Sequence, residues 1–149
     1  MRRSDDRRGS AAYTRQVCGR AVERVRHRFE AQRAFDFLAK TGDAVCVVDD
    51  RQRIVLWNAA ASKLLGLWPG EVLDRHCYDV VRFDDASGCR FCCKRCPIQR
   101  AARRGRIVAT REMRVTTRRR VRLAVDVATV VFPSRWLAHL FHPRQHKPA

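Results

Sequence analysis

The spacing of apolar residues changes near residue 42, where a helical pattern gives way to a pattern of short strands. From Ala11 to Lys40 there is no proline, and apolar residues recur at steps of three and four with arginines between them. This spacing predicts an amphipathic helix over residues 11–40, after a charged and disordered tail over residues 1–10. About thirty residues exceed the usual length of a helix in a small domain, so we expect this helix to form a homodimer. Packing on its own domain is the alternative.

Two short apolar runs follow the predicted helix. They cover Ala44–Val48 and Ile54–Trp57, and a polar turn joins them. Two such runs with a tight turn between them predict a β-hairpin. Asn58 is a favourable N-cap for a helix over Ala59–Leu65, and Gly66 can end that helix in left-handed backbone.

The second half of the chain predicts one more helix and three more strands. The helix covers Ile98–Arg104 and ends at Gly105. Polar turns separate the strands, which are expected at Ile107–Thr116, Val121–Phe132 and Arg135–Phe141. Trp57 and Trp136 are expected to be core aromatics. The order of elements predicts an α+β domain over residues 41–142, with a polar tail over residues 143–149.

The region after residue 41 resembles a PAS domain. The shared features are a hairpin, then "WN", an alanine-rich helix ending in "LLG", and a short segment containing "GE". The matching residues are Gly42, Asp43, Val48, Asp50, Trp57, Asn58, Ala60, Leu65, Gly66, Pro69, Gly70 and Glu71. The likeness spans about Phe35 to His142. It implies a five-stranded antiparallel sheet with short helices over one face, preceded here by a long N-terminal helix, and a signal-sensing role.

Five of the seven cysteines lie between residues 76 and 97. They are Cys77, Cys89, Cys92, Cys93 and Cys96. Two C-x-x-C pairs, at 89/92 and 93/96, place sulfur atoms within reach of one metal ion or cluster. Adjacent side chains do not easily enter one site, so the expected ligands are Cys77, Cys89, Cys96 and either Cys92 or Cys93.

The surroundings of these cysteines favour chemistry over inert packing. Four cations are expected to lower the thiol pKa values, namely Arg90, Lys94, Arg95 and Arg100. Lower values favour metal binding and redox reactivity alike, so iron-sulfur or zinc binding and thiol–disulfide switching both stay open. Cys18 and Cys46 are instead interpreted as packed apolar groups.

Other polar residues near the cluster receive no chemical role. His76 is either a ligand or a surface residue. His139, His142 and His146 are assigned to an edge strand and the tail, without a metal role. Asp84 and Asp85 are interpreted as a solvated loop.

The cysteine segment carries a second resemblance. "CY", an acidic loop with glycine and then "C-x-x-CP" is a pattern found in a subset of bacterial PAS domains in regulators and sensor kinases. Here it is matched by His76-Cys77-Tyr78 and by the segment from Cys93 to Pro97. In outline the segment is also similar to PAS oxygen sensors whose four cysteines hold a [4Fe-4S] cluster. Those sensors use two separated C-x-x-C pairs, whereas here Cys77 alone replaces one pair.

The formal net charge of +17 comes almost wholly from arginine. Such a charge raises nonspecific affinity for nucleic acid, although arginine use of this kind also follows from a GC-rich genome. No apolar run is long enough to span a membrane and no secretion signal is visible, so a cytoplasmic protein without membrane association is expected. Phosphate-binding loops, hydrolase nucleophile motifs and paired carboxylates are missing from the sequence, which argues against an enzyme.

The leading hypothesis is a stand-alone PAS sensor. It would detect redox state or oxygen through a cysteine-bound metal or iron-sulfur centre, or through thiol oxidation. Its partner would be a transcription regulator or a sensor kinase. The alternative is a basic nucleic-acid-binding or interaction protein with a structural zinc site.

Overall fold

The computed structural model describes residues 32–145. The chain divides into two units, residues 1–36 and residues 37–149, and the second contains every strand described below. Residues 32–40 are helical, in agreement with the end of the predicted N-terminal helix. The rest of that helix, the tail over residues 1–10, Cys18 and His146 lie outside the described residues.

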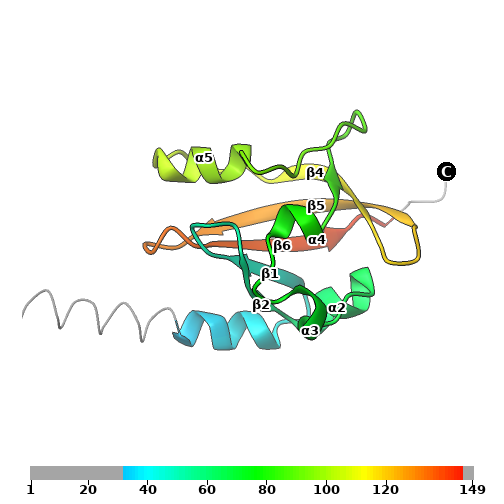
Figure 1. Cartoon of the computed structure of the whole chain (residues 1–149), viewed down its shortest axis with the longest axis horizontal. Coiled ribbons are helices and arrows are strands. Elements are labelled where there is room, and N and C mark those ends of the chain that lie inside the picture. Colours follow the sequence, from blue (N-terminus) through cyan, green and yellow to red (C-terminus); the bar gives the residue numbers. More distant parts are fainter. Residues whose placement is uncertain (1–31, 146–149) are drawn as a thin grey trace, which may run out of the picture. The chain divides into compact units, whose positions relative to one another are not determined.

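The centre of the second unit is one antiparallel sheet of six strands in the order β2-β1-β6-β5-β4-β3 (Figure 1). The strands are β1 (Ala44–Val48), β2 (Ile54–Trp57), β3 (Phe83–Asp84), β4 (Arg111–Thr116), β5 (Arg122–Val131) and β6 (Leu137–Pro143). The sequence predicted five strands. The sixth, β3, has only two residues, too few to show a period, and it pairs with β4 through Phe83 and Asp84.

Four short helices pack against one face of this sheet, as predicted. They are α2 (Ala59–Leu65), α3 (Pro69–Val72), α4 (Cys77–Val80) and α5 (Pro97–Arg103). Leu65, Val72 and Ile98 bring α2, α3 and α5 into a single buried cluster with the sheet. Cross-strand register places Cys46 of β1 opposite both Trp57 and His139. Because directly paired residues share a face, Cys46 and His139 lie on the side that the helices cover.

Asn58 holds the start of the domain together. Its side-chain oxygen accepts hydrogen bonds from the backbone N–H groups of Ala61 and Val45, both at 2.9 Å. Its amide nitrogen donates to the backbone oxygens of Asp43 at 2.7 Å and Leu38 at 3.1 Å. One buried amide therefore caps α2 and joins it to β1 and to the segment before β1.

Three details of the predicted strands differ in the structure. β4 begins at Arg111 and not at Ile107, whose side chain is 97% exposed and contributes nothing to the core. β6 extends to Pro143, so the polar tail begins later than predicted. Trp136 precedes β6 and is only half-buried, whereas Trp57 is a core residue as expected.

The prediction of a solvated loop is wrong for Asp84. Its side chain is 2% exposed, and Arg122 on β5 contacts it at 2.9 Å. Arg82 lies 3.6 Å from its other oxygen. Asp85 is exposed as expected, and its carboxylate accepts hydrogen bonds from Ser87 and from the Cys89 N–H. Asp84 therefore forms a buried ion pair, whereas Asp85 stabilises a turn.

Candidate functional site

The predicted cysteine cluster lies on α4 and on the loop between β3 and α5. Cys77 is the first residue of α4, and Cys96 is the N-cap of α5. Cys77, Cys92 and Cys96 are half-buried, whereas Cys89 and Cys93 are exposed. All five are free thiols, and so is the buried Cys46.

An apolar pocket of about 40 Å³ lies between this loop and the sheet. Four cysteines line it, namely Cys46, Cys77, Cys92 and Cys96. The remaining lining residues are Val81, Phe83, Phe91, Ile98, Met113, Val127, His139 and Phe141. We call this cavity, defined by those twelve residues, the thiol pocket.

The structure brings together only part of the predicted ligand set. Cys77, Cys92 and Cys96 share the thiol pocket, whereas Cys89 and Cys93 do not line it. Cys92 and Cys93 are neighbours in sequence, yet one enters the pocket and the other is exposed. The C-x-x-C pairs visible in the sequence therefore do not correspond to pairs of sulfurs in the pocket.

Two residues of the pocket received no chemical role from the sequence. Cys46 was predicted to pack as an apolar group, and it is a core residue, but its sulfur also lines the thiol pocket. His139 was placed on an edge strand, which is wrong, because β6 lies between β1 and β5. Strand alternation carried the signal for Cys46, since Ala44, Cys46 and Val48 share one face of β1. His139 joins this face through its pairing with Cys46.

Burial raises the thiol pKa values in the pocket, contrary to the prediction that nearby cations would lower them. Loss of hydration is the largest cause and takes the pKa of both Cys77 and Cys92 to about 12. The pKa values of Cys46 and Cys96 are raised for the same reason. Arg90 and Arg100 act in the predicted direction, but their effect is smaller than that of burial.

The neighbouring thiols reinforce this effect. Negative charge on Cys92 or Cys96 would raise the pKa of Cys77, and Cys96 acts on Cys92 in the same way. The sulfurs are therefore close enough to influence one another electrostatically. Burial also lowers the pKa of His139 to about 4, and its Nδ1 lies 3.0 Å from the Thr129 hydroxyl. At neutral pH the pocket holds protonated thiols and a neutral imidazole.

Arg90 fastens the cysteine loop to α4. Its Nε donates to the backbone oxygen of Cys92 at 3.1 Å, and its Nη2 donates to that of Tyr78 at 2.7 Å. The backbone N–H groups of Phe91 and Cys92 both point to the Phe83 oxygen on β3. The loop is thus held to α4 and to β3 by hydrogen bonds to backbone oxygens. Arg90 mainly holds the loop in place, and its lowering of the thiol pKa is the smaller effect.

Gln52 connects the same loop to the β1–β2 turn. The Cys77 N–H donates to the Gln52 backbone oxygen at 2.8 Å, and the Gln52 side chain donates to the Cys93 oxygen at 3.2 Å. Gln52 is buried and adopts a left-handed φ of 63°, a conformation that is uncommon for residues other than glycine. It therefore joins the start of α4, the hairpin turn and the cysteine loop.

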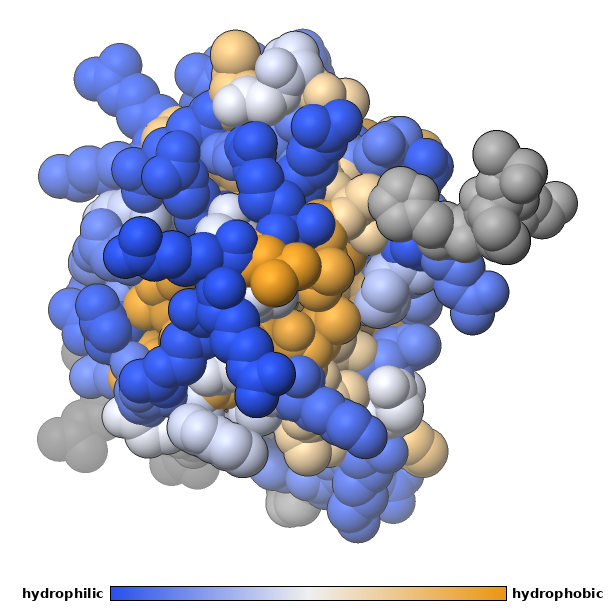
Figure 2. All heavy atoms as spheres, turned by 90° about the vertical axis from the view of Figure 1, so that its right-hand side faces the viewer, coloured by the Kyte–Doolittle hydropathy of each residue, from blue (hydrophilic) through white to orange (hydrophobic). Residues whose placement is uncertain are grey.

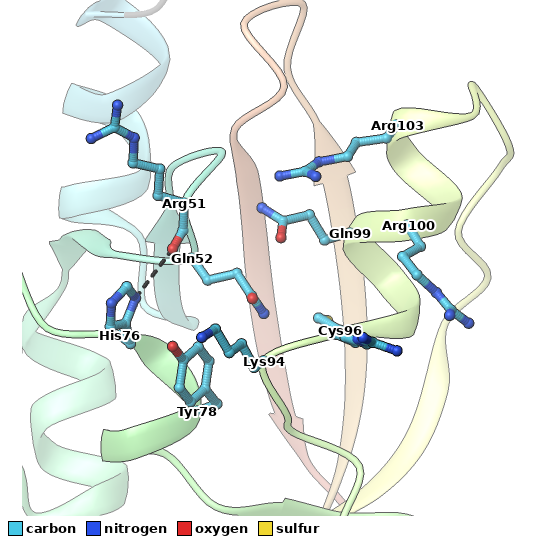
Figure 3. Close-up of a pocket in the computed structure, with 10 residues that line it drawn as sticks. Arg51, Gln52, His76, Tyr78, Lys94, Cys96, Gln99, Arg100 and Arg103 are labelled. Atoms are coloured by element: carbon cyan, nitrogen blue, oxygen red, sulfur yellow. Dashed lines mark hydrogen bonds between the residues drawn. The ribbon is translucent and has the colours of Figure 1, made fainter.

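A second, polar hollow lies on the outer side of Cys96 (Figure 3). It has a volume of about 390 Å³, and we call it the basic groove. Its lining residues are Arg51, Gln52, His76, Tyr78, Lys94, Arg95, Cys96, Gln99, Arg100 and Arg103. His76, left open as a ligand or surface residue, lies here and not in the thiol pocket, and its Nδ1 is 3.1 Å from the Arg51 oxygen.

Comparison with protein families gives a match to the PAS fold over residues 23–139. This range covers more than half of the chain. It includes all of β1 to β5, the four helices α2 to α5 and the whole cysteine segment. The chain belongs to the PAS family.

Solved PAS domains share the fold at low sequence identity. The PAS domain of an HTR-like protein from Haloarcula marismortui is 18% identical, with a TM-score of 0.52 over 85% of this chain and 99% of that one. A domain of a sensory box sensor histidine kinase/response regulator from Geobacter sulfurreducens is 14% identical, with a TM-score of 0.52 over 77% and 95%. The PAS domain of nitrogen regulation protein NR(II) from Vibrio parahaemolyticus is also 14% identical, with a TM-score of 0.50 over 74% and 97%.

No curated protein matches this PAS sequence significantly. Within residues 32–145, no helix is both long and apolar enough to cross a membrane.

The donor atoms of this PAS domain's thiol pocket suit a soft metal. Thiolate sulfur with one imidazole is the ligand chemistry of zinc, copper(I) and iron-sulfur centres. Cys46, Cys77, Cys92, Cys96 and His139 are the residues that could supply it. As they stand, no three of the described cysteine, histidine or carboxylate side chains are arranged to hold one metal ion. Binding would therefore require these side chains to move closer together.

Proposed function

We propose that this PAS domain senses redox state at the thiol pocket and passes the change to a partner protein. The observation that carries the proposal is the convergence of four cysteines from three separate segments. Cys46 comes from β1, Cys77 from α4, and Cys92 and Cys96 from the two ends of the segment before α5. Four thiols around one small apolar cavity exceed what packing alone requires, since aliphatic side chains would fill the same space.

Two reactions fit this arrangement. In oxidation, two thiols lose two electrons and two protons to a peroxide and form a disulfide, while the peroxide is reduced to water. In metal loading, each sulfur gives up a proton when it becomes a ligand of zinc or of an iron-sulfur cluster. Burial holds the pocket thiols in the protonated, less reactive state, so both reactions first require a thiol to lose its proton, and exposure of the loop to water would favour this step. Both also draw the sulfurs closer together.

The contacts of Gln52 give such a movement a route out of the pocket. A shift of Cys77 or of the cysteine loop changes the hydrogen bonds that Gln52 makes with each. Gln99 on α5 donates to the backbone oxygens of Asp49 and Asp50 in the same hairpin turn, at 3.2 and 3.0 Å. The hairpin turn and α5 therefore respond together to the state of the pocket.

The partner would be a sensor kinase or a transcription regulator. Support comes from the family, since solved PAS domains that share this fold belong to two-component sensor histidine kinases by name. A homodimer formed by the N-terminal helix would carry the signal, and that helix lies mostly outside the described residues. Nucleic-acid binding with a structural zinc site remains the second hypothesis.

The first experiment measures metal, sulfide and thiol content in protein purified without air. Absorbance near 400 nm together with iron and sulfide would identify a cluster, and one bound zinc would identify a zinc site. Protein without metal is expected to lose two titratable thiols when treated with a stoichiometric peroxide. A metal-free protein that keeps all its thiols under this treatment would contradict the proposal.

A pair of double variants localises the response. Cys92→Ser/Cys96→Ser removes two sulfurs of the pocket, and Cys89→Ser/Cys93→Ser removes two exposed sulfurs of the same loop. The first variant is expected to abolish metal binding or disulfide formation, whereas the second retains it. Equal loss in both variants would show that the exposed thiols carry the chemistry, and the proposed pocket would then be wrong.

A further inference from the structure

All the charged side chains that line the basic groove are positive. Five cationic side chains line it, namely Arg51, Lys94, Arg95, Arg100 and Arg103, and no aspartate or glutamate does. Some other described arginines form ion pairs with carboxylates, for example Arg118 with Glu71 and Arg144 with Glu112. With the residues that the structure describes, none of the five groove cations forms an ion pair. Cations gathered without carboxylates create a positive potential that favours an anionic occupant.

The walls of this groove are fixed to one another. Arg103 donates to the backbone oxygen of Asp50 at 2.6 Å. Together with the two hydrogen bonds of Gln99, this contact holds α5 against the hairpin turn. Gln99 is itself buried. In Figure 3, Gln99 and Arg103 point from α5 toward the hairpin turn, and Lys94 lies beside Tyr78. A ligand would therefore meet walls whose backbone is already held in place, and binding would order the exposed Lys94 and Arg95 side chains.

The volume of the groove suits a small anion. A volume of about 390 Å³ falls in the range of sites for small molecules. A nucleic-acid backbone instead binds along an extended basic surface, with phosphates spaced along the strand. Guanidinium groups match the oxygens of phosphate and carboxylate, and Tyr78 adds a hydroxyl donor at the rim. We propose that the basic groove binds a small polyanion, a phosphorylated or polycarboxylated metabolite. This inference does not rest on the redox chemistry of the thiol pocket.

Calorimetric titration of the reduced protein with pyrophosphate and with citrate tests this site. Lys94→Gln/Arg95→Gln removes two cations of the groove whose side chains make no hydrogen bond with the described residues. Arg104→Gln/Arg106→Gln removes two exposed cations just beyond α5, outside the groove. The groove variant is expected to bind the better of the two probes at least about tenfold more weakly, and the control variant within about twofold of the native protein.

Three results would overturn the proposal. One is the absence of binding to either probe at low ionic strength. Another is an equal loss of affinity in both double variants, which would indicate attraction to net charge alone. The third is a single-stranded oligonucleotide that binds more tightly than either probe and loses affinity in the groove variant, which would assign the groove to nucleic acid. Preference for pyrophosphate over citrate would identify a phosphate ligand, and the reverse a carboxylate ligand, and either preference supports the site.

Discussion

At the scale of single residues, opposing effects decide the chemistry of the site. The sequence places cations next to the cysteines, and from this we predicted lowered thiol pKa values. The structure shows that burial outweighs them and raises the pKa values of Cys77 and Cys92 to about 12. Arg90 follows Cys89 directly in the loop, but its guanidinium donates to backbone oxygens. Neighbours in sequence therefore indicate which charges are present, but not which environment dominates.

Asn58 is the residue whose loss is expected to cost the most stability for its size. Asn58→Ala removes the cap of α2 and leaves the buried N–H of Val45 and the Asp43 oxygen without this partner. Loss of a cap costs about 1 kcal/mol, and each buried polar group left unpaired adds about 1–3 kcal/mol. We expect the free energy of unfolding to fall by about 3 kcal/mol, measured by urea denaturation.

Asn58→Asp is the matched control for this prediction. It keeps the oxygen that accepts from Ala61 and Val45 but loses the amide that donates to Leu38 and Asp43. Its stability should lie between those of the native protein and Asn58→Ala. An alanine variant as stable as the native protein would show that water replaces the amide at no cost.

At the scale of elements, α3 is joined to the β4–β5 turn by one side chain. The Glu71 carboxylate accepts the Trp68 N–H at 2.9 Å and both contacts from the Arg118 guanidinium, at 2.8 and 2.9 Å. The Trp68 hydrogen bond first, and then Arg118, lower the pKa of Glu71 below its usual 4.5. A lowered folded-state pKa stabilises the protein above the unfolded-state pKa, and this stabilisation is lost as pH falls through the lower folded-state value.

This gives a pH-dependent prediction for Glu71→Gln. The variant should unfold at a lower temperature than the native protein at neutral pH. The difference should shrink as the pH falls below about 4.5, because the native carboxyl then also becomes neutral. Thermal unfolding followed by circular dichroism at a series of pH values measures it. A difference that does not change with pH would assign the effect of the substitution to packing.

Elements formed by neighbouring residues could be predicted, and those formed by distant residues could not. The bounds of β1, β2 and α2 agree with the prediction, because alternation, the Asn58 cap and Gly66 are all local signals. β3 was missed because its two residues become a strand only by pairing with β4. The crowding of five cysteines was visible in the sequence, and three of them line the thiol pocket. Alternation places Cys46 on the covered face of β1, but its neighbours in the pocket come from distant parts of the chain and no spacing reveals them.

At the scale of the whole molecule, uncompensated positive charge is the main electrostatic feature. The formal net charge is +17. Figure 2 shows hydrophilic side chains over most of one face, around an apolar area. Repulsion among so many like charges on a small protein opposes compaction, and salt screens this repulsion. Five of these positive charges lie together in the basic groove.

Salt should therefore raise the thermal stability of this protein. We expect the unfolding temperature to rise with sodium chloride at neutral pH, and to rise less in Arg104→Gln/Arg106→Gln, because that variant carries two fewer positive charges. Differential scanning calorimetry measures both slopes. An unfolding temperature that falls with added chloride would show that the ion pairs of the native state outweigh its self-repulsion.

Cys96 lines both the thiol pocket and the basic groove. An anion that prefers one state of the sulfur must shift the reduction potential of that sulfur, and the potential must in turn shift the anion's affinity. The two effects are equal in free energy, so a tenfold preference corresponds to about 30 mV for a two-electron couple. A metabolite in the groove would thus set the threshold at which the pocket switches. The oxidation of the pocket would then depend on the concentration of that anion.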